Sequence, residues 1–302
     1  MNLSMDRPHG VRLFKSFQAI LDMCPDEQRK EWYLSPYTST DAPVIIAGCG
    51  RSGTSLLRTM LNAHPSFFCG PETALMLPMV GEQETITRKL AWLLDISEHP
   101  IRDLWTVPSQ AMFVDVLFTT ICLSKSKLRW AEKTPKNVMV MEWINRHWPN
   151  AYFIHMIRDG RDVIASLREH PKWKIVKGKR VPTNVRQPLK PCVERWILET
   201  REGLKWRGFP RYIELYYEDL IKFPDIRLPT LFRQINAPYD PRVLDPANRA
   251  CDPVKDPQGA NADQPLNTAS LGRWKKDLSD EELAFIYSTP ALELLTELGY
   301  AI

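Results

Sequence analysis

The chain has 302 residues, 44% of them hydrophobic and 25% charged, which is enough for one sizeable α/β domain with a helical periphery. A net charge of +4 is too small to indicate a nucleic-acid partner. The first ten residues contain Asp6, Arg7 and Pro8 rather than a signal-peptide core, and later apolar stretches are too short to span a bilayer. We therefore expect a cytoplasmic protein without an integral membrane segment.

Strand-like and helix-like segments alternate along the chain. Residues 1–42 are predicted to form a helical N-terminal extension and residues 43–302 the core of a single domain, 1–302. Apolar, β-branched or aromatic runs predict strands at 44–47, 128–131, 152–157 and 212–216. Helices are expected at 54–63, 84–96, 109–124, 136–147, 160–169 and 191–206. This alternation predicts an α/β fold with a P-loop-like central parallel sheet flanked by helices. Residues 237–270, rich in Pro, Asp and Asn, predict an extended loop.

A glycine-rich loop follows the first predicted strand. Gly48, Gly50 and Gly53 interrupt the apolar run, and apolar residues at helical spacing resume after them. A strand, a glycine loop and a helix in this order aim backbone N–H groups and a helix dipole at one point, which predicts an anion site. Side-chain donors for phosphate or sulfate oxygens are carried by Arg51, Ser52, Thr54 and Ser55.

The loop differs from a Walker A motif at one decisive position. Gly48 and Gly53 have the Walker spacing, but Thr54 stands where nucleotide-hydrolysing families need Lys. This disfavours a P-loop nucleotide kinase or an ATPase. For the loop taken alone, a purely structural strand-to-helix turn remains an equal alternative.

Four segments in order share a pattern with a known family. They are Arg51–Pro65 with Cys69–Thr73, Trp130–Asn137, Tyr152–Ser166 and Ser270–Lys275. Together they resemble the sulfotransferases that use 3′-phosphoadenosine 5′-phosphosulfate (PAPS), most of all the tyrosylprotein sulfotransferases and their bacterial relatives. The resemblance implies the sulfotransferase fold, PAPS as co-substrate and PAP as product. It also implies that residues 51–55, Gly53 included, hold the 5′-phosphosulfate. No H-E-x-x-H motif, paired Cys motif or acidic cluster in the sequence argues for a metal, so we expect none.

Arg158 and Ser166 are predicted to clamp a phosphate. Arg158 follows a buried strand, at the edge where open α/β sheets bind ligands, and Asp159-Gly160 turns the chain into a helix that carries Ser166. The resemblance implies that this pair holds the 3′-phosphate. The alternative is that Arg158 only pairs with a carboxylate such as Asp159 or Asp162.

Glu72 and Lys133 are the predicted catalytic residues. A carboxylate within reach of an attacking hydroxyl can take its proton, and a compact cation can stabilise the charge on a departing oxygen. The resemblance places Glu72 in the family's catalytic segment and Lys133 at its phosphosulfate-binding Lys. The alternative for Glu72 is a first-turn charge on a helix that begins near Ala74.

Four further residues are predicted to contact the nucleotide. Tyr217 follows the last predicted strand in a Tyr-Glu-x-Leu element, which in the family lies near the adenosine. The resemblance also places Gly272, Arg273 and Trp274 close to the 3′-phosphate, with the glycine allowing close backbone contact.

The acceptor is the least determined part of the prediction. Residues 171–191 contain seven basic and no acidic residues, which favours an anionic acceptor or a solvated basic loop equally. Tyrosylprotein enzymes carry Gly-Glu-Glu-Thr-Arg where this chain has Gly70-Pro71-Glu72-Thr73-Ala74. We therefore expect a carbohydrate, lipid or other small-molecule hydroxyl as acceptor. A peptide tyrosine is the alternative, and a nucleotide kinase or a non-catalytic nucleotide-binding protein is the alternative from another class.

Overall fold

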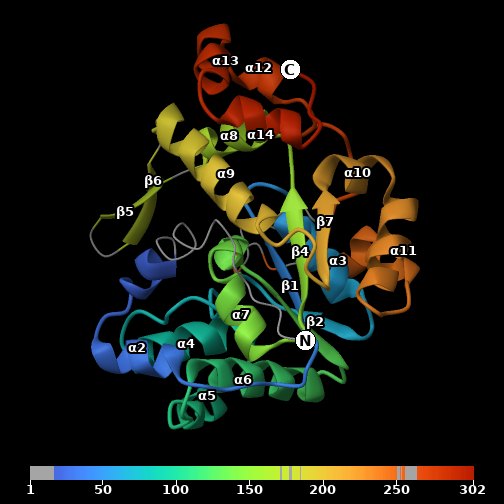
Figure 1. Cartoon of the computed structure of the whole chain (residues 1–302). Helices are drawn as coiled ribbons and strands as arrows, with labels where there is room; N and C mark the ends of the chain where they lie inside the picture. Colours follow the sequence, from blue (N-terminus) through green and yellow to red (C-terminus); the bar gives the residue numbers. More distant parts are fainter. Residues whose placement is uncertain are drawn as a thin grey trace, which may run out of the picture.

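The computed structural model describes residues 17–170, 172–176, 179–183, 185–249, 252, 254–255 and 264–302. Its centre is a five-stranded, fully parallel sheet in the order β2-β3-β1-β4-β7 (Figure 1). The strands are β1 (Val44–Gly48), β2 (Phe67–Cys69), β3 (Arg129–Lys133), β4 (Tyr152–Ile157) and β7 (Tyr212–Tyr216). Helices flank this sheet, so the predicted P-loop-like α/β class is confirmed.

The central strand β1 is buried on both faces, as its apolar sequence requires. Val44 is paired with Ala131 of β3 on one side and Tyr152 of β4 on the other. Successive side chains point to opposite faces, so Val44 and Ile46 join one apolar cluster while Ile45 joins the other. This two-sided burial is typical of a parallel sheet with helices on both faces.

One face of the sheet packs against α3 (Thr54–Ala63) and α11 (Pro224–Gln234). Leu57, Met60 and Leu61 lie at helical spacing on α3 and are fully buried. Each contributes about 1.5–3 kcal/mol of apolar burial relative to an exposed side chain. The helix that follows the glycine loop is therefore fixed firmly to the sheet.

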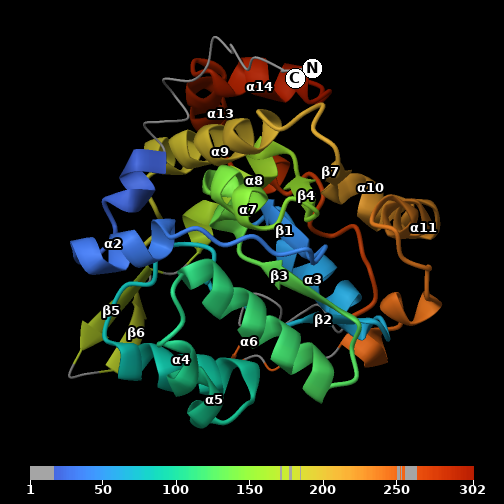
Figure 2. The same cartoon turned by 60° about the horizontal axis from the view of Figure 1, so that its bottom comes forward.

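The other face carries a larger group of helices, visible at the bottom of Figure 1 and in front in Figure 2. These are α2 (Glu27–Leu34), α4 (Gln83–Leu94), α5 (Glu98–Leu104), α6 (Gln110–Ser124) and α7 (Met141–His147). A third apolar cluster joins α8 (Gly160–Glu169), α9 (Leu189–Leu204) and α14 (Ala291–Glu297) beyond the carboxyl ends of the strands. Further helices are α10 (Tyr217–Lys222), α12 (Trp274–Asp277) and α13 (Asp280–Tyr287). No helix in the described part of the chain is long and apolar enough to cross a membrane.

Several elements agree with the sequence-based boundaries and others do not. Helices 54–63 and 160–169 and strands 152–157 and 212–216 are found at the predicted residues. The helix predicted at 136–147 is divided, because Pro135 begins a 3-10 turn (Pro135–Met139) and Val140, with φ of −127° and ψ of 19°, separates that turn from α7. The predicted 237–270 loop contains two 3-10 turns, Pro241–Val243 and Pro246–Arg249, and part of it lies outside the described residues.

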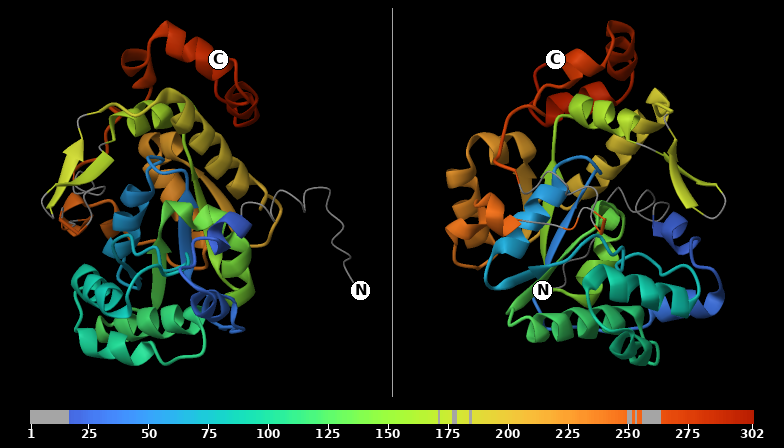
Figure 3. Two further views of the ribbon diagram at one scale, coloured as in Figure 1. Left: turned by 90° about the vertical axis from the view of Figure 1, so that its left-hand side faces the viewer. Right: turned by 180° about the vertical axis from the view of Figure 1, so that it is seen from behind.

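The basic segment contains an unpredicted antiparallel hairpin. It consists of β5 (Lys172–Val176) and β6 (Lys179–Thr183), with Lys174 opposite Val181. The hairpin stands beside the body between α8 and α9, apart from the central sheet (Figure 3). The side chains of residues 171–184 lie outside the described part of the structure, so the expectation of an anionic acceptor on them stays untested.

Candidate active site

The carboxyl ends of the five parallel strands meet at one edge of the sheet, and a predicted site residue stands at each of them. Across the sheet in spatial order these are Glu72 after β2, Lys133 at the end of β3, residues 51–55 after β1, Arg158 after β4 and Tyr217 after β7. Residues that are far apart in the sequence are therefore neighbours along this edge.

The glycine loop has the backbone of an anion cradle. Gly53 precedes α3 with φ of 91°, and Arg51 also has a left-handed φ of 75°. A Cβ at residue 53 would lie 2.3 Å from Cδ2 of Tyr217, so a side chain there would displace the ring. Ser52 and Thr54 are buried beside the first turn of α3. The first backbone N–H groups of a helix have no acceptor within the helix, so they can bind an anion.

Arg158 lies between the glycine loop and the C-terminal segment. Its guanidinium stacks over the Tyr217 ring at 4.5 Å, and Nη1 donates to the Arg51 carbonyl at 3.1 Å. Nη2 reaches the Ser270 carbonyl and lies 3.5 Å from Asp162 Oδ2. Nε is buried and has no hydrogen-bond partner among the described residues, so this arginine keeps a donor for a further anion.

The alternative prediction, that Arg158 only pairs with a nearby carboxylate, agrees with the structure only in part. Asp159 pairs with Arg161 at 2.8 Å and caps α8 by accepting from the Arg161 N–H. Asp162 lies near Arg158, but its two oxygens also accept the N–H groups of Gly272 and Trp274 at 2.9 and 3.0 Å. Asp162 thus anchors the segment that contains Gly272 and Trp274 beside Arg158.

Four more predicted residues, Tyr217 and Gly272, Arg273 and Trp274 of the C-terminal segment, lie at Arg158 and the first turn of α8. The Tyr217 hydroxyl is hydrogen-bonded to Ser270 Oγ at 2.8 Å. Gly272 takes φ of 68°, and Trp274 stacks under the Arg161 guanidinium at 4.2 Å. Arg273 is held by Asp277 through a 2.6 Å hydrogen bond from Nε. The structure therefore brings the predicted residues 272–274 to the strand-end edge where Arg158 lies.

Arg51 points toward Ser166. Its Nε donates to Ser166 Oγ at 3.1 Å, so the first loop residue and the predicted 3′-phosphate residue meet. Burial lowers the pKa of Arg51, and the positive charges of Arg158, Arg273 and Arg195 lower it further. Clustered cations of this kind repel one another and are stabilised by a polyanion.

Glu72 and Lys133 are in direct contact. Glu72 Oε2 lies 2.9 Å from Lys133 Nζ, the Lys133 side chain is fully buried, and the Glu72 side chain is 43% exposed. The prediction of a helix that begins near Ala74 is wrong, because Ala74 has a left-handed φ of 59° and α4 begins only at Gln83. Glu72 is therefore not a first-turn helix charge.

A buried carboxylate, Glu132, fixes the segment that carries Glu72. It accepts hydrogen bonds from Thr73 Oγ1 at 3.0 Å, Thr134 Oγ1 at 2.6 Å and Asn137 Nδ2 at 2.5 Å. The Ala74 N–H donates to Thr134 Oγ1 at 3.0 Å, which bends the chain away from a helix. Burial raises the pKa of Glu132 against these three donors. Sequence reasoning missed this residue, and its position directly after the predicted strand 128–131 was the available signal.

Sequence reasoning also missed two residues of α9. Arg195 and Glu199 lie one turn apart and form an ion pair of 3.0 Å beside the glycine loop. Their i,i+4 spacing next to the apolar stripe of Cys192, Val193 and Trp196 was the available signal.

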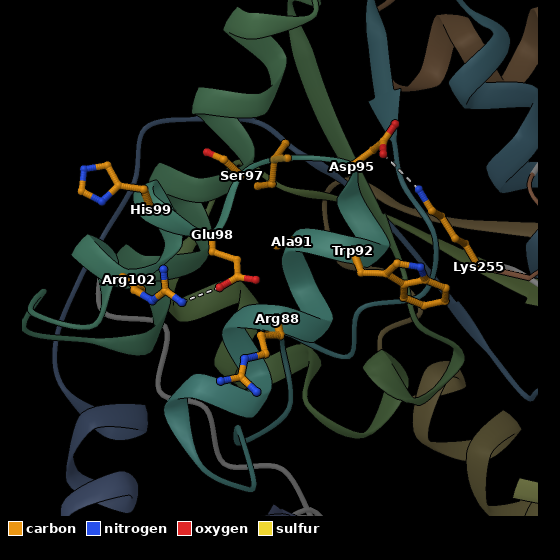
Figure 4. A pocket seen from close by; sticks show the side chains of 10 residues that line it. Arg88, Ala91, Trp92, Asp95, Ser97, Glu98, His99, Arg102 and Lys255 are labelled. Carbon is orange, nitrogen blue, oxygen red and sulfur yellow. Dashed lines mark hydrogen bonds and ion pairs between the residues drawn. The ribbon is translucent and has the colours of Figure 1, made fainter. Parts of the chain in front are cut away.

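A separate surface cleft of about 850 Å³ opens between α4 and α5 (Figure 4). Several of its charged groups pair with one another: Arg102 pairs with Glu98, and Lys255 pairs with Asp95 at 3.2 Å, beside the half-exposed Trp92. None of the predicted site residues lines it. Across the described residues, no group of three His, Cys, Asp or Glu side chains is placed to hold a metal ion.

The fold defines an α/β protein of the P-loop-like class, with its candidate anion site at the carboxyl edge of the sheet. The family model described as "Sulfotransferase family" matches residues 43–241. The chain therefore belongs to the sulfotransferase family, and the resemblance seen in the sequence is confirmed.

Curated relatives are named as protein-tyrosine sulfotransferases. "Protein-tyrosine sulfotransferase 1" of Danio rerio is 27% identical over 207 residues, which cover 68% of this chain and 56% of the relative. "Putative protein-tyrosine sulfotransferase" of Caenorhabditis briggsae is 30% identical over 212 residues, covering 67% and 68%. The chain thus spans between about half and two thirds of the length of these two relatives.

Solved structures share the fold. The sulfotransferase domain of the Synechococcus PCC 7002 olefin synthase superposes with a TM-score of 0.64 at 18% identity, covering 89% of this chain and 99% of that one. Mouse sulfotransferase SULT7A1 complexed with PAP gives a TM-score of 0.50 at 11% identity, covering 91% and 89%. At these identities the likeness establishes the sulfotransferase fold.

Proposed function

We propose that this protein transfers the sulfuryl group of PAPS to an acceptor hydroxyl and releases PAP. The observation that carries the proposal is the contact between Glu72 and Lys133 at 2.9 Å, at the same sheet edge as a glycine anion loop. A proton acceptor and a buried cation side by side suit the attack of a hydroxyl and the departure of a phosphate oxygen.

The residues present fit the nucleotide. The buried Nε of Arg158, which has no partner among the described residues, offers a donor to a phosphate oxygen. Arg51 and Ser166 lie together next to it, and Tyr217 presents its ring across the glycine loop. We assign the 3′-phosphate to Arg158 and Ser166, and the 5′-phosphosulfate to the amides and hydroxyls of residues 51–55.

In the proposed reaction one bond to sulfur forms as another breaks, and no step uses a metal ion held by the chain. The acceptor oxygen forms a bond to sulfur while the bond between sulfur and the 5′-phosphate oxygen breaks. Glu72 takes the acceptor proton, and Lys133 stabilises the negative charge on the departing phosphate oxygen. PAPS supplies an activated sulfuryl group, so the chain's own contribution is to position, to accept the proton and to neutralise charge.

For the acceptor we propose a carbohydrate, lipid or small-molecule alcohol. The chain lacks both the first Glu and the Arg of the tyrosylprotein segment, having Pro71 and Ala74 at those positions. A peptide tyrosine is the second candidate, and the names of the curated relatives favour it. Transfer from labelled PAPS to a saccharide, an aliphatic alcohol and a tyrosine peptide in parallel separates the two.

The test of the nucleotide is a parallel calorimetric titration with PAP, 5′-AMP and Mg-ATP. We expect PAP to bind at least tenfold more tightly than 5′-AMP, because Arg158 and Ser166 add charge-assisted contacts to its 3′-phosphate. A preference for Mg-ATP, or equal binding of PAP and 5′-AMP, would refute the proposal in favour of a kinase or a non-catalytic nucleotide-binding protein.

A further inference from the structure

Glu199 joins helix α9 to the glycine loop. Its Oε1 accepts from Arg195 Nε at 3.0 Å and its Oε2 from the Gly50 N–H at 3.3 Å. The Glu199 side chain is only 5% exposed. One buried carboxylate thus uses both oxygens to fix an arginine and the start of the loop relative to each other.

The Arg195 guanidinium lies directly against residue 50. A Cβ at Gly50 would stand 2.8 Å from Nη2 of Arg195, so glycine makes room for the guanidinium at this position. Glu199 engages the Nε side, and the Arg195 side chain remains 40% exposed. The fork of Nη donors is therefore held rigidly while part of it stays accessible to a ligand.

Arg195 adds a cation where several already meet. Burial lowers the pKa of Arg51, and the positive charges of Arg158, Arg273 and Arg195 lower it further. The pKa of His170 is likewise lowered by burial and then by the positive charges of Arg51 and Arg195. A solvated surface ion pair on the same helix looks different: Arg201 meets Glu293 and Glu297 only at 3.8 and 3.9 Å.

We propose that Arg195 is a further binding residue for the 5′ end of the nucleotide, with Glu199 as the residue that positions it. The inference rests on the proposed function, because it assumes a ligand with phosphate at both the 3′ and 5′ positions. The 5′ end is chosen because the guanidinium lies on Gly50, in the loop that follows β1, whereas Arg158 follows β4. Arg195 then supplies a planar pair of donors to oxygens cradled by the loop.

Three ligands separate the two ends of the site: PAP, 5′-AMP and 3′-AMP, titrated calorimetrically into the full-length protein. Arg195→Met should weaken PAP and 5′-AMP by a similar factor, about 10- to 100-fold, the loss of one charge-assisted contact, and leave 3′-AMP within about twofold. Arg158→Ala should show the opposite pattern, weakening PAP and 3′-AMP but not 5′-AMP. Arg201→Met, the matched arginine on α9, should change none of the three.

Two further variants guard against a purely structural effect. Glu199→Gln keeps the shape but not the charge, and it should weaken the same two ligands as Arg195→Met, by a smaller factor. Arg195→Lys keeps the charge but not the fork, and it should fall between wild type and Arg195→Met. Loss of all three ligands together, loss confined to PAP and 3′-AMP, or no loss in Arg195→Met would overturn the inference. Failure of the wild-type protein to bind PAP would instead overturn the proposed function.

Discussion

Replacing Glu72 by Gln separates proton transfer from binding. Glu72 Oε2 lies 2.9 Å from Nζ of Lys133, whose side chain is fully buried, while the Glu72 side chain is 43% exposed. A glutamine keeps the length of the side chain and an oxygen that accepts from Lys133. It has no basic oxygen for an acceptor proton, so the substitution removes the proposed base and preserves the local packing.

The size of the effect follows from these roles. Loss of a general base lowers turnover by about 10²- to 10⁴-fold, or about 3–5 kcal/mol of activation free energy. The stability loss should be about 1 kcal/mol, because water reaches the Glu72 side of the ion pair and the hydrogen bond is retained. PAP affinity should stay within about twofold, because Glu72 follows β2, three strands away from the β4 end that carries Arg158.

The assay measures three quantities on the same preparations. Turnover is followed as transfer of labelled sulfate from PAPS to whichever acceptor of the saccharide, alcohol and tyrosine-peptide panel is sulfated. PAP affinity is measured by calorimetry, and stability by urea denaturation. Glu142→Gln is the matched control, since Glu142 is an exposed carboxylate 3.7 Å from Arg146 on α7. Turnover within about threefold of wild type, or a PAP affinity that falls as far as turnover, would refute the assignment of Glu72 as base.

Three other perturbations test the site and the residues that support it. Arg158→Ala should raise the calorimetric Kd for PAP by about 10- to 100-fold and leave that for 5′-AMP within about twofold, since the contact is to the 3′-phosphate; equal losses would contradict this. Gly53→Ala should destabilise the fold by about 1–3 kcal/mol, because the left-handed φ and the Tyr217 ring both oppose a Cβ; a Tm within about 1 °C of wild type would contradict it. Burial raises the pKa of Glu132, so its carboxyl stabilises the fold below its unfolded-state pKa, and this contribution is lost as pH rises through the folded-state pKa. In urea denaturation, the stability of wild type relative to Glu132→Gln should therefore fall as the pH rises above about 4. A flat or rising difference would count against the raised pKa.

The parts of the fold set by local pattern were predictable. The apolar run at 152–157 and the amphipathic helix at 54–63 are found at their predicted residues, because buried parallel strands and helical stripes have strong periodicity. Strand β2, Phe67–Cys69, was missed, since three residues are too few to show a period. The hairpin at 172–183 was missed because alternating Lys residues and a Gly in a basic run also suit a solvated loop.

The site residues that follow strand ends could be predicted from the sequence. The buried residues that bond to distant segments could not. Glu72, Lys133 and Arg158 each stand at or after a strand, so parallel pairing alone brings them to one edge. Glu132 and Glu199 act from beneath that edge, and their hydrogen bonds to Thr73 and Gly50 join segments 59 and 149 residues apart. Local sequence patterns carry no information on such pairings, because a buried carboxylate is stable only once its donors from distant segments are in place.

The order of the strands also gives the proposed nucleotide a direction across the site. Glu72 and Lys133 follow β2 and β3, the glycine loop follows β1, and Arg158 and Tyr217 follow β4 and β7. With the 5′ group over the loop and the 3′-phosphate at Arg158, as we propose, the nucleotide crosses the edge of the sheet between these two points. In this proposal the transferable group projects away from Arg158 and toward Lys133, whose Nζ lies 2.9 Å from Glu72 Oε2. With this orientation an acceptor must approach from the β2 side, past Gly70–Ala74, and that segment is where the chain departs from the tyrosylprotein pattern.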